Sequence, residues 1–571
     1  MPLALKLGHS RADTCQNGQL FLDFYRVSGS MPRNQVSAIT RKGWTAFAIF
    51  AAGLSSCSSI RLKSYWIDRG PIADHLHAGM QTGSPYAPHN RQLRSMLQAN
   101  RKLHRSMPVE LHGFAWDFED FQEIVFPGHY GNQRLKTGHQ RDGIGVPVVV
   151  VRRRLTDTED LHKSFLPQTS SFAATAVLSP NGEVLHFFNP VTVRTVQYGD
   201  ALDSVRSPSA SAEVDATELY ADTGIELPLA YDLTSSLAYA MHHHPQTRLQ
   251  DFVRPDRADD PSKLTMLEPY QSDKIPLILI HGLLSSPDTF GEICNQLRAD
   301  EDLMQDYQLW VFGYPTGKPF LRSAGELREQ LDRVLSDLDP EAENPFLRQS
   351  VMAGHSMGGL ITKLMISYSG EQVWNSVSRV PLEAMAVEDR FRAQLAQRFY
   401  FDPHPMISRA VFIATPHRGS STAGRAIGKM ASALVVQSDT GMQELIRKNP
   451  TAIRETLSEG LPTSIDMLDP YQPFLRILNS LQLSEGIPLH SIVGTGGPLF
   501  GVHQSDGVVP YDSAHWDGVQ SERKVPTTHS SILTRNETVE ELQRILREHR
   551  ATIASQFPDD DATIPTSQSQ P

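Results

Sequence analysis

The stretch VMAGHSMGGLI, residues 351–361, places a serine between two glycines in the pattern G-x-S-x-G. The apolar run SVMA predicts a buried strand, and the following MGGLITKLMISY predicts a helix. In such a strand–turn–helix unit the serine occupies a strained turn, and the glycines let strand and helix approach without a clash of Cβ atoms. Ser356 is therefore a candidate nucleophile. The alternative is a glycine-rich turn with an incidental serine, so the rest of the chain has to be read for partner groups.

Short apolar runs on both sides of this stretch alternate with longer segments of helical pattern. The runs are PLILI (276–280), LWVFGY (309–314), SVMAG (350–354), RAVFIAT (409–415) and PLHSIVG (488–494). Fully apolar strands separated by helices indicate a mostly parallel sheet covered on both faces. We therefore expect an α/β domain over residues 271–550. Within it, segments 367–405 and 420–485 exceed ordinary loop lengths and predict helical cap insertions over a site.

The segment LILIHGLLSSPDTF is a second candidate part of the site. Its strand ends at His281-Gly282, which places the next backbone groups at the carboxyl edge of the sheet. There the N–H of Leu283, together with that of Met357, could bind a developing oxyanion. The simplest interpretation of the His281 imidazole is that it shapes this loop.

A nucleophilic serine on such a turn needs a base and an orienting acid, which follow it in the order acid, then histidine. Asp506 lies in a Ser-Asp-Gly turn after the run PLHSIVG. His529 follows the apparent strand RKVP, and we expect it to open the last helix. Competing acids are Asp512 and Asp517, and competing bases are His503 and His515. We favour Asp506 and His529 by role and order.

Taken together, IHGLLSSPDTF, GHSMGGL, FIATPHRGS and SDGVVP followed by TTHS resemble the α/β-hydrolase superfamily. The similarity is to its serine esterase and lipase group, which includes bacterial lipoprotein hydrolases and GPI-inositol-deacylase-like enzymes, and it covers about half of the chain. It implies an α/β-hydrolase fold, a Ser356, Asp506, His529 triad and hydrolysis of carboxylic esters through an acyl-enzyme, with no metal or cofactor. After the strand FIAT, His417 and Arg418 are expected, with His281, at the rim of the substrate site. His417 and Arg418 could touch an acidic head group, but a structural role at the rim is the simpler interpretation.

Other functions remain open at this stage. An acyltransferase or a peptidase could use the same three residues, because a fold does not determine the reaction. A non-catalytic, lipid-anchored binding protein with a relict site is the alternative that is not an enzyme. The expected partner is a small ester or lipid substrate, and the sequence leaves the acyl chain length and the oligomeric state open.

The segment TRKGWTAFAIFAAGLSSCSS, residues 40–59, has the parts of a secretion signal. Arg41 and Lys42 precede an apolar run that ends in small residues before Cys57. The run is too short to cross a membrane, which takes roughly 20 residues. It resembles the signal peptide of bacterial lipoproteins, which implies that residues 31–57 form the signal and that Cys57 is acylated as the mature N-terminus. The alternative is a core helix with an incidental cysteine.

Further expectations follow from that resemblance. Met31 makes a better start than Met1, so residues 1–30 are expected to be a non-native extension. Ser58 stands where an aspartate often marks inner-membrane retention, which favours the outer membrane of a bacterial cell envelope, facing the periplasm or the exterior.

Residues 58–270 predict a mixed α+β region. The runs VPVVVV (146–151), SFAATAVL (171–178) and EVLHFFNP (183–190) predict strands, and the last two form a hairpin that could join the main sheet. His242, His243 and His244 are adjacent, so in a helix they point in different directions and cannot share one metal ion. The polar segment 551–571 predicts a disordered tail.

Composition excludes several classes of protein. The 571 residues carry a net charge of -11 without a basic stripe, which argues against nucleic acid as a partner. The three cysteines, Cys15, Cys57 and Cys294, lie far apart and form neither a disulfide framework nor a C-x-x-C metal site.

Overall fold

The computed structural model describes about three fifths of the chain. The described residues are 86–99, 108–114, 121–127, 135–153, 165–166, 169–179, 184–198, 225–243, 262–420, 440–454, 466–497 and 504–556. The predicted extension, the signal peptide with Cys57, and His244 and His503 lie outside them. None of the helices in the described ranges is long and apolar enough to span a membrane.

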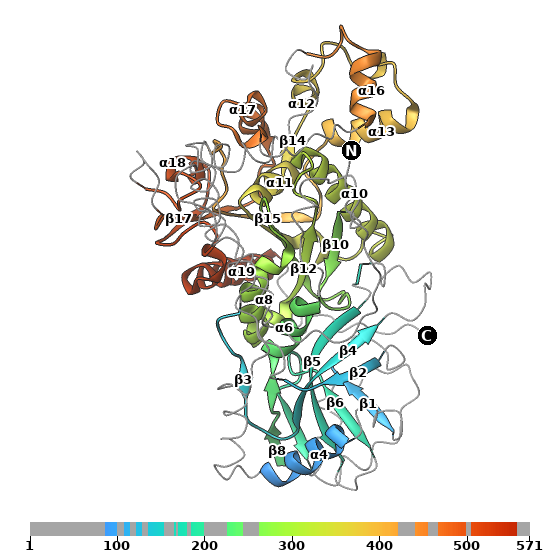
Figure 1. Cartoon of the computed structure of the whole chain (residues 1–571), viewed down its shortest axis with the longest axis vertical. Helices are drawn as coiled ribbons and strands as arrows, with labels where there is room; N and C mark the ends of the chain where they lie inside the picture. The colour runs from blue at the N-terminus through green and yellow to red at the C-terminus, as the bar shows by residue number, and fades with distance from the viewer. Residues whose placement is uncertain are drawn as a thin grey trace, which may run out of the picture. The chain divides into compact units, whose positions relative to one another are not determined.

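The C-terminal half is built on a seven-stranded sheet (Figure 1). Its strands are β10 (Lys263–Met266), β11 (Ile275–Ile280), β12 (Tyr307–Gly313), β13 (Ser350–His355), β15 (Ile407–Ile413), β17 (Leu489–Gly494) and β18 (Ser521–Val525). The spatial order is β10-β12-β11-β13-β15-β17-β18, and every neighbouring pair is parallel except β10 with β12. This order, with one antiparallel strand at the edge and helices in the connections, is the α/β-hydrolase fold. The predicted fold class is confirmed.

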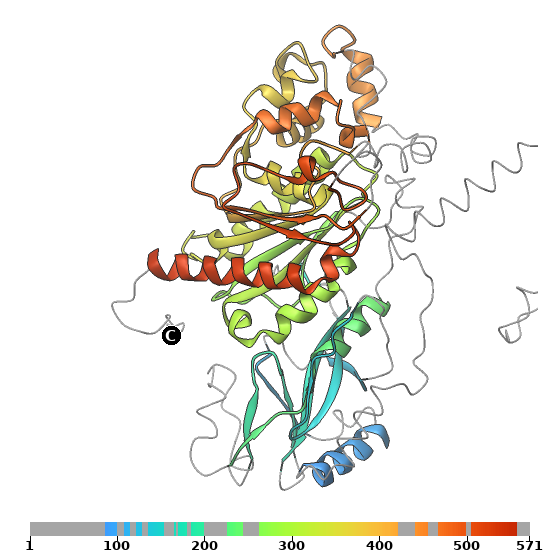
Figure 2. The same ribbon diagram turned by 90° about the vertical axis from the view of Figure 1, so that its left-hand side faces the viewer.

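Helices cover both faces of this sheet, as Figure 2 shows. The main ones are α8 (Gly291–Ala299), α9 (Glu301–Asp306), α10 (Phe320–Leu338), α11 (Met357–Met365) and α19 (Asn536–Gln556). Side chains along a strand alternate between its faces. Leu277 and Leu279 of β11 therefore pack with α8 and α19, while Ile278 and Ile280 pack with α10 and α11. Because both faces are buried, the strands are apolar throughout.

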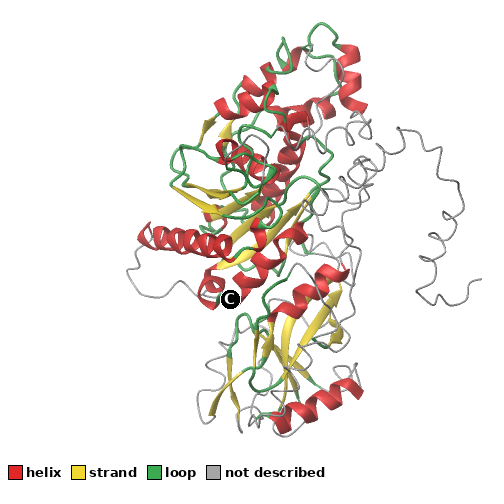
Figure 3. Cartoon of the chain, turned by 60° about the vertical axis from the view of Figure 1, so that its left-hand side comes forward, coloured by secondary structure: helices red, strands yellow, loops and turns green. Residues whose placement is uncertain are grey.

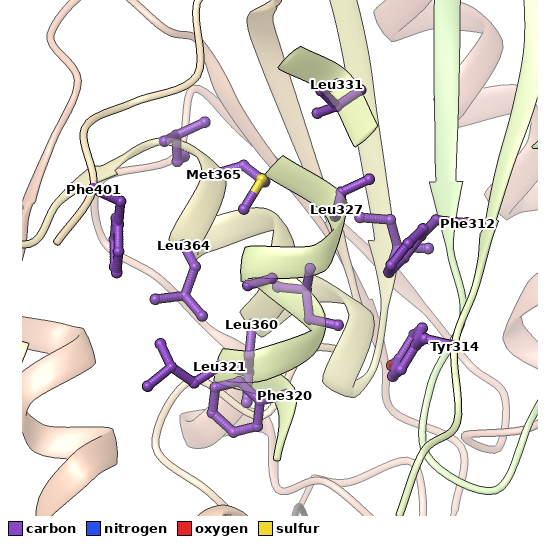
Figure 4. Packing of buried hydrophobic residues seen from close by; sticks show 14 of the residues in the cluster. Phe312, Tyr314, Phe320, Leu321, Leu327, Leu331, Leu360, Leu364, Met365 and Phe401 are labelled. Atoms are coloured by element: carbon purple, nitrogen blue, oxygen red, sulfur yellow. The ribbon is translucent and has the colours of Figure 1, made fainter. Parts of the chain in front are cut away.

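The core between the sheet and helices α10 and α11 is shown in Figure 4. Leu360 and Leu364 lie one helical turn apart on α11 and face Leu327 of α10. All three side chains are fully buried. On the sheet side they meet Phe312 of β12. Burial of one such side chain contributes about 1.5–3 kcal/mol, so this interface holds α11, and with it the preceding turn, firmly in place.

The two predicted cap insertions both contain helices. These are α12 (Gln372–Asn375) and α13 (Asp389–Phe399) in the first, and α16 (Thr440–Lys448) and α17 (Pro473–Ser480) in the second. The insertions contact each other through a β-bridge between Ser378 and Ile453. In addition, the backbone N–H of Ala386 donates to Asn449 Oδ1 at 2.8 Å. The insertions also share a short antiparallel sheet of β14 (Ser367–Tyr368) and β16 (Gln482–Leu483).

The N-terminal region forms a separate five-stranded sheet, visible among the yellow strands of Figure 3. Its order is β1 (Val109–His112), β6 (Leu185–Phe188), β5 (Thr169–Leu178), β4 (Val146–Arg153) and β2 (Phe121–Val125). The remaining elements are α4 (Ala87–Ala99), α6 (Leu233–His243) and the short strands β3 (Gln140–Arg141), β7 (Thr195–Tyr198), β8 (Ile225–Pro228) and β9 (Tyr231–Asp232). The predicted hairpin exists as β5–β6, but the expectation that it joins the main sheet is wrong. From the region before residue 271, β10 joins it instead.

Two further expectations need correction. His529 does not open the last helix, because a 3-10 turn (Ile532–Thr534) intervenes and α19 begins only at Asn536. That helix extends to Gln556, so the expectation of disorder is wrong for residues 551–556, and residues 557–571 lie outside the described ranges.

Glu292 of α8 joins the N-terminal region to the hydrolase fold. Its carboxylate accepts hydrogen bonds from the backbone N–H of Lys136 at 2.6 Å and from the hydroxyl of Thr137 at 2.8 Å. The carbonyl of Thr137 in turn accepts from Asn295, also on α8. Glu292 is 1% exposed, and these bonds satisfy a carboxylate that would otherwise be costly to bury.

Candidate active site

Ser356 stands on a strained turn between β13 and α11. Its φ of 55° and ψ of -123° are unusual for a residue with a side chain. The turn is held on both sides, since the Ser356 N–H donates to the carbonyl of Ile413 at 2.8 Å and the Gly359 N–H donates to the carbonyl of Ser356 at 2.9 Å. The turn lies at the carboxyl edge of the sheet, where loops from several strands meet.

The glycines on both sides of Ser356 are required by close backbone packing. A Cβ on Gly354 would lie 2.3 Å from the carbonyl oxygen of Gly358, and a Cβ on Gly358 would lie 2.2 Å from the carbonyl oxygen of Ile280. Neither contact is possible, because the atoms it meets belong to backbone that cannot move aside. The G-x-S-x-G pattern is thus explained by the packing of α11 against β13 and β11.

The structure brings Ser356, His529 and Asp506 together although they are far apart in sequence. His529 Nε2 lies 2.9 Å from Ser356 Oγ, and His529 Nδ1 lies 2.6 Å from Asp506 Oδ2. All three are buried, with 7%, 9% and 2% of their surface exposed. Such a chain of hydrogen bonds runs from a hydroxyl through an imidazole to a carboxylate, which is the arrangement that activates a serine.

Asp506 is positioned by the turn in which it lies. Its Oδ1 accepts the backbone N–H groups of Val508 at 2.9 Å and Val509 at 2.7 Å, and its carbonyl accepts the N–H of His529 at 2.9 Å. Burial raises the pKa of this carboxyl, but the charge and hydrogen bond of His529 and the two backbone N–H groups outweigh it. The net pKa is below the ordinary value of 3.8, so the carboxylate is ionised at neutral pH.

His355, next to Ser356, contacts His529 and was not singled out from the sequence. Its Nε2 lies 3.2 Å from the carbonyl oxygen of His529. Burial lowers the pKa of His355 to about 3, so the ring is neutral and carries one proton. Because Nδ1 has no partner among the described residues, that proton belongs on Nε2, which donates to His529. His355 thus supports the backbone of His529.

The backbone groups predicted to bind an oxyanion border the turn. Met357 is the first residue of α11, so its N–H has no partner within the helix, and the N–H of Leu283 follows the end of β11. Within the described ranges neither N–H donates a hydrogen bond. The next residue, Leu284, has a positive φ of 53°, and its N–H donates to Thr316 Oγ1 at 3.2 Å. That bond holds the loop of Leu283 in a strained conformation.

The side chain of His281 does not lie at the rim of the substrate site, so that expectation is wrong. It is 1% exposed and stacks on Tyr314, with ring centroids 4.4 Å apart. The Tyr314 hydroxyl donates to the carbonyl of His281 at 2.8 Å. Burial lowers the pKa of the imidazole to about 4, which leaves it neutral. His281 therefore shapes the loop that carries Leu283.

His417 and Arg418 differ in exposure. The imidazole of His417 is fully buried and has no hydrogen-bond partner within the described ranges, so the expected rim position is wrong for its side chain. The side chain of Arg418 is about half exposed and donates to the carbonyl of His515 at 2.9 Å. Arg418 also lines a cavity of about 360 Å³. The cavity is lined by Arg418, Pro470, Leu475, Arg476, Asn479 and Ser480, none of which belongs to the hydrogen-bonded chain.

A buried lysine lies beside this cavity. Lys363 of α11 donates to Asn479 Oδ1 at 2.7 Å and lies over the ring of Trp516, 3.4 Å from its centroid. Burial, together with the nearby charge of Arg418, lowers the pKa of Lys363 well below its ordinary value. Its place on the second turn of an apolar helix gave no sequence signal for such an environment.

Two of the competing residues, His515 and Asp517, bond each other. His515 has Nδ1 2.6 Å from Glu522 and Nε2 2.9 Å from Asp517, so both of its nitrogens are occupied. These carboxylates raise the pKa of His515, with Glu522 the larger cause. Asp512 lies on α18 (Tyr511–Ala514), where its carbonyl accepts a bond from Arg418.

A second cluster of titratable groups lies in the N-terminal sheet, and it has the donor types of a metal site. Glu110, His112 and His186 bring one donor atom each to within 4.8 Å of the others. Burial, more than the neighbouring charges, lowers the pKa of His112 to about 4. The hydrogen bond with His186 lowers the pKa of Glu110. At neutral pH the His112 imidazole is thus neutral and the Glu110 side chain is a carboxylate.

No protein family model matches the sequence, and no curated protein is significantly similar to it. Solved structures that resemble the chain include esterases and a lipase. The mature lipase BlEst2 of Bacillus licheniformis is 15% identical, with a TM-score of 0.30, over 50% of this chain and 99% of that chain. Esterase B of Lactobacillus rhamnosis is 15% identical, with a TM-score of 0.30, over 53% of this chain and 84% of that chain. An esterase of Pyrobaculum calidifontis is 14% identical, with a TM-score of 0.29, over 51% of this chain and 80% of that chain. These similarities are too distant to assign a substrate or a site.

Proposed function

We propose that the protein is a serine hydrolase of carboxylic esters in which Ser356, His529 and Asp506 form the catalytic triad. The observation that carries the proposal is the continuous set of hydrogen bonds from Ser356 Oγ to the Asp506 carboxylate, at 2.9 and 2.6 Å, on a strained strand–helix turn. A buried serine with these partners has little structural purpose, because the turn costs conformational energy. The geometry suits acyl transfer.

In the proposed reaction His529 Nε2 takes the proton of Ser356 as the hydroxyl attacks the ester carbonyl. The N–H groups of Leu283 and Met357 stabilise the oxyanion that forms, and the ionised Asp506 stabilises the imidazolium of His529. His529 then protonates the leaving alcohol, which gives an acyl-enzyme on Ser356. Water, activated by the same imidazole, releases the acid and restores the hydroxyl. These steps need no metal ion or cofactor.

The test compares the wild type with Ser356→Ala on nitrophenyl esters of short and long acyl chains. Loss of the nucleophile should lower kcat/KM by about 10³-fold or more. Ser491→Ala is a matched control, since Ser491 is also a buried serine of the sheet and its hydroxyl has no partner in the part of the chain that the structure describes. Equal hydrolysis by the wild type and Ser356→Ala would reject the proposal.

Products decide between hydrolysis and transfer. We infer that water is the acyl acceptor, and assays with added alcohol or peptide amines would detect an ester or amide product if the enzyme were an acyltransferase. Failure of a fluorophosphonate probe to label Ser356 would favour instead a binding protein with a relict site.

We also propose a lipid anchor at Cys57 and a location in the bacterial cell envelope. The support is the sequence of residues 40–59 alone. Mass spectrometry of the mature N-terminus should find an acylated Cys57, and Cys57→Ala should abolish membrane association. Residues 1–30 on the mature protein would contradict the proposal.

A further inference from the structure

The cluster of Glu110, His112 and His186 is built by two adjacent strands. Glu110 and His112 are two residues apart on β1, so their side chains lie on one face of the sheet. The parallel pairing of β1 with β6 sets His186 directly beside Glu110. Their neighbours Leu111 and Phe187 pack into the apolar core of the other face. Three polar side chains are thus gathered at one point by the register of the strands.

The distances among the three donor atoms match those around a tetrahedral ion. His112 Nε2 and His186 Nδ1 are 3.1 Å apart, and Glu110 Oε2 lies 3.3 Å from His186 Nδ1 and 3.8 Å from His112 Nε2. Bonds of 2.0–2.1 Å in a tetrahedron put the ligand atoms about 3.3–3.4 Å apart. A circle through the three atoms has a radius of about 2.0 Å, so one ion just off their plane can reach all three at zinc distances.

Hydrogen bonds alone do not satisfy this cluster. A carboxylate oxygen and two imidazole nitrogens converge, and the 3.8 Å separation between Glu110 and His112 is too long for a hydrogen bond. A proton on His186 Nδ1 faces two acceptors, Glu110 Oε2 at 3.3 Å and His112 Nε2 at 3.1 Å, and can be well aligned with only one of them. Three lone pairs around one point are satisfied together by a cation.

We propose that Glu110, His112 and His186 form a zinc-binding site with three protein ligands. Nitrogen donors favour zinc over calcium or magnesium, which take oxygen ligands. The side chains of His112 and Glu110 are 12% and 27% exposed, so water can occupy the fourth position. Bound zinc would tie the edge strand β1 to β6. The site belongs to the N-terminal sheet and is separate from the proposed hydrolytic mechanism.

The test uses the full chain freed of metal with a chelator and titrated with zinc chloride. We expect one zinc ion per chain and a higher unfolding midpoint with zinc, because zinc binds the folded state. Glu110→Gln nearly keeps the shape of the side chain, and His112→Asn replaces the ring of a partly exposed residue with a smaller polar group. Each should weaken zinc binding by on the order of 100-fold, because one of only three ligands is lost.

His515→Asn is the matched control. His515 also contacts two carboxylates, but they bond its opposite ring nitrogens, so these groups cannot close on one ion. This variant should bind zinc as the wild type does. Cobalt(II) added to the wild type should show the intense visible bands of tetrahedral coordination, a readout that needs no variant. Equal zinc affinity in the wild type and folded His112→Asn, or cobalt bands of octahedral type, would overturn the proposal.

Discussion

The carboxylate of Asp506 uses both oxygens to organise its surroundings, one toward His529 and the other toward two backbone N–H groups. A neutral amide could keep some of these contacts but not the charge. Because hydrogen bonds to a charged group contribute about 1.5–3 kcal/mol, the ionised form is important to the fold as well as to the proposed chemistry.

The contribution of Asp506 to stability should depend on pH. Its folded pKa lies below its ordinary value of 3.8, so the ionised carboxylate stabilises the fold above that pH and the contribution is lost as the pH falls through the folded value. We expect the wild type to exceed Asp506→Asn in free energy of unfolding at pH 7, with a gap that narrows below about pH 4. Urea unfolding of both proteins across this range measures the gap. A constant gap would contradict a lowered pKa.

His355 should act by positioning the base. His355→Phe keeps a ring but removes the N–H that faces the carbonyl of His529. We expect kcat on nitrophenyl esters to fall about five- to tenfold with KM nearly unchanged, since one neutral hydrogen bond contributes about 1 kcal/mol. His404→Phe, at a buried histidine bonded to Asp332, is the control and should keep kcat. A change confined to KM would argue for contact with substrate instead.

At the scale of elements, the contact of α11 with β13 and β11 creates the turn of Ser356. The helix starts directly after the strand because Gly354 and Gly358 bring backbone against backbone. Its apolar face then packs under α10 (Figure 4). Packing of the whole helix supplies the energy that holds one residue in a strained conformation.

A methyl group at this contact should therefore be costly. Gly358→Ala would place Cβ 2.2 Å from the carbonyl oxygen of Ile280, so we expect a loss of about 2–4 kcal/mol in the free energy of unfolding. Gly138→Ala is the control, because a Cβ there meets no atom within 4 Å, and it should change stability by less than about 0.5 kcal/mol. Chemical denaturation of the two variants makes the comparison. Similar stability in both would show that the backbone around Gly358 can give way.

At the scale of the whole molecule, the N-terminal region and the hydrolase fold are joined by buried hydrogen bonds and by an exposed ion pair. Glu292 bonds Lys136 and Thr137, whereas Glu301 lies 3.6 Å from Arg194 and its side chain is 54% exposed. Removal of a buried acceptor leaves its donors unsatisfied, whereas an exposed ion pair is screened by water and contributes little.

Loss of Glu292 should thus weaken this connection. Glu292→Ala leaves the donors of Lys136 and Thr137 without their acceptor, and we expect a loss of about 1–3 kcal/mol. Glu301→Ala should cost no more than about 1 kcal/mol. Thermal unfolding followed by calorimetry would measure both. If the two variants behave alike, Glu292 does not hold the two regions together.

The sequence by itself determined most strands of the main sheet, the strand–turn–helix unit around Ser356 and the presence of two long inserted segments with helices. These features depend on local patterns: apolar runs of strand length, glycines at a tight turn, and segments too long for loops. The fold class follows from them and is confirmed. Local patterns do not predict which sheet a strand joins, because that depends on pairing between distant segments. For this reason the place of β10 in the main sheet, and of the hairpin β5–β6 outside it, could not be predicted.

Only the tertiary structure decided which groups meet. Chain order left several acids and bases open near residue 510, and the return of the chain after β17 and β18 brings Asp506 and His529 to Ser356 while His515 bonds other carboxylates. The burial of His281 and His417, the support from His355 and the Glu110, His112, His186 cluster likewise arise from strand register and helix packing. Most of these contacts join residues far apart in the chain, so they cannot be predicted from spacing along the sequence.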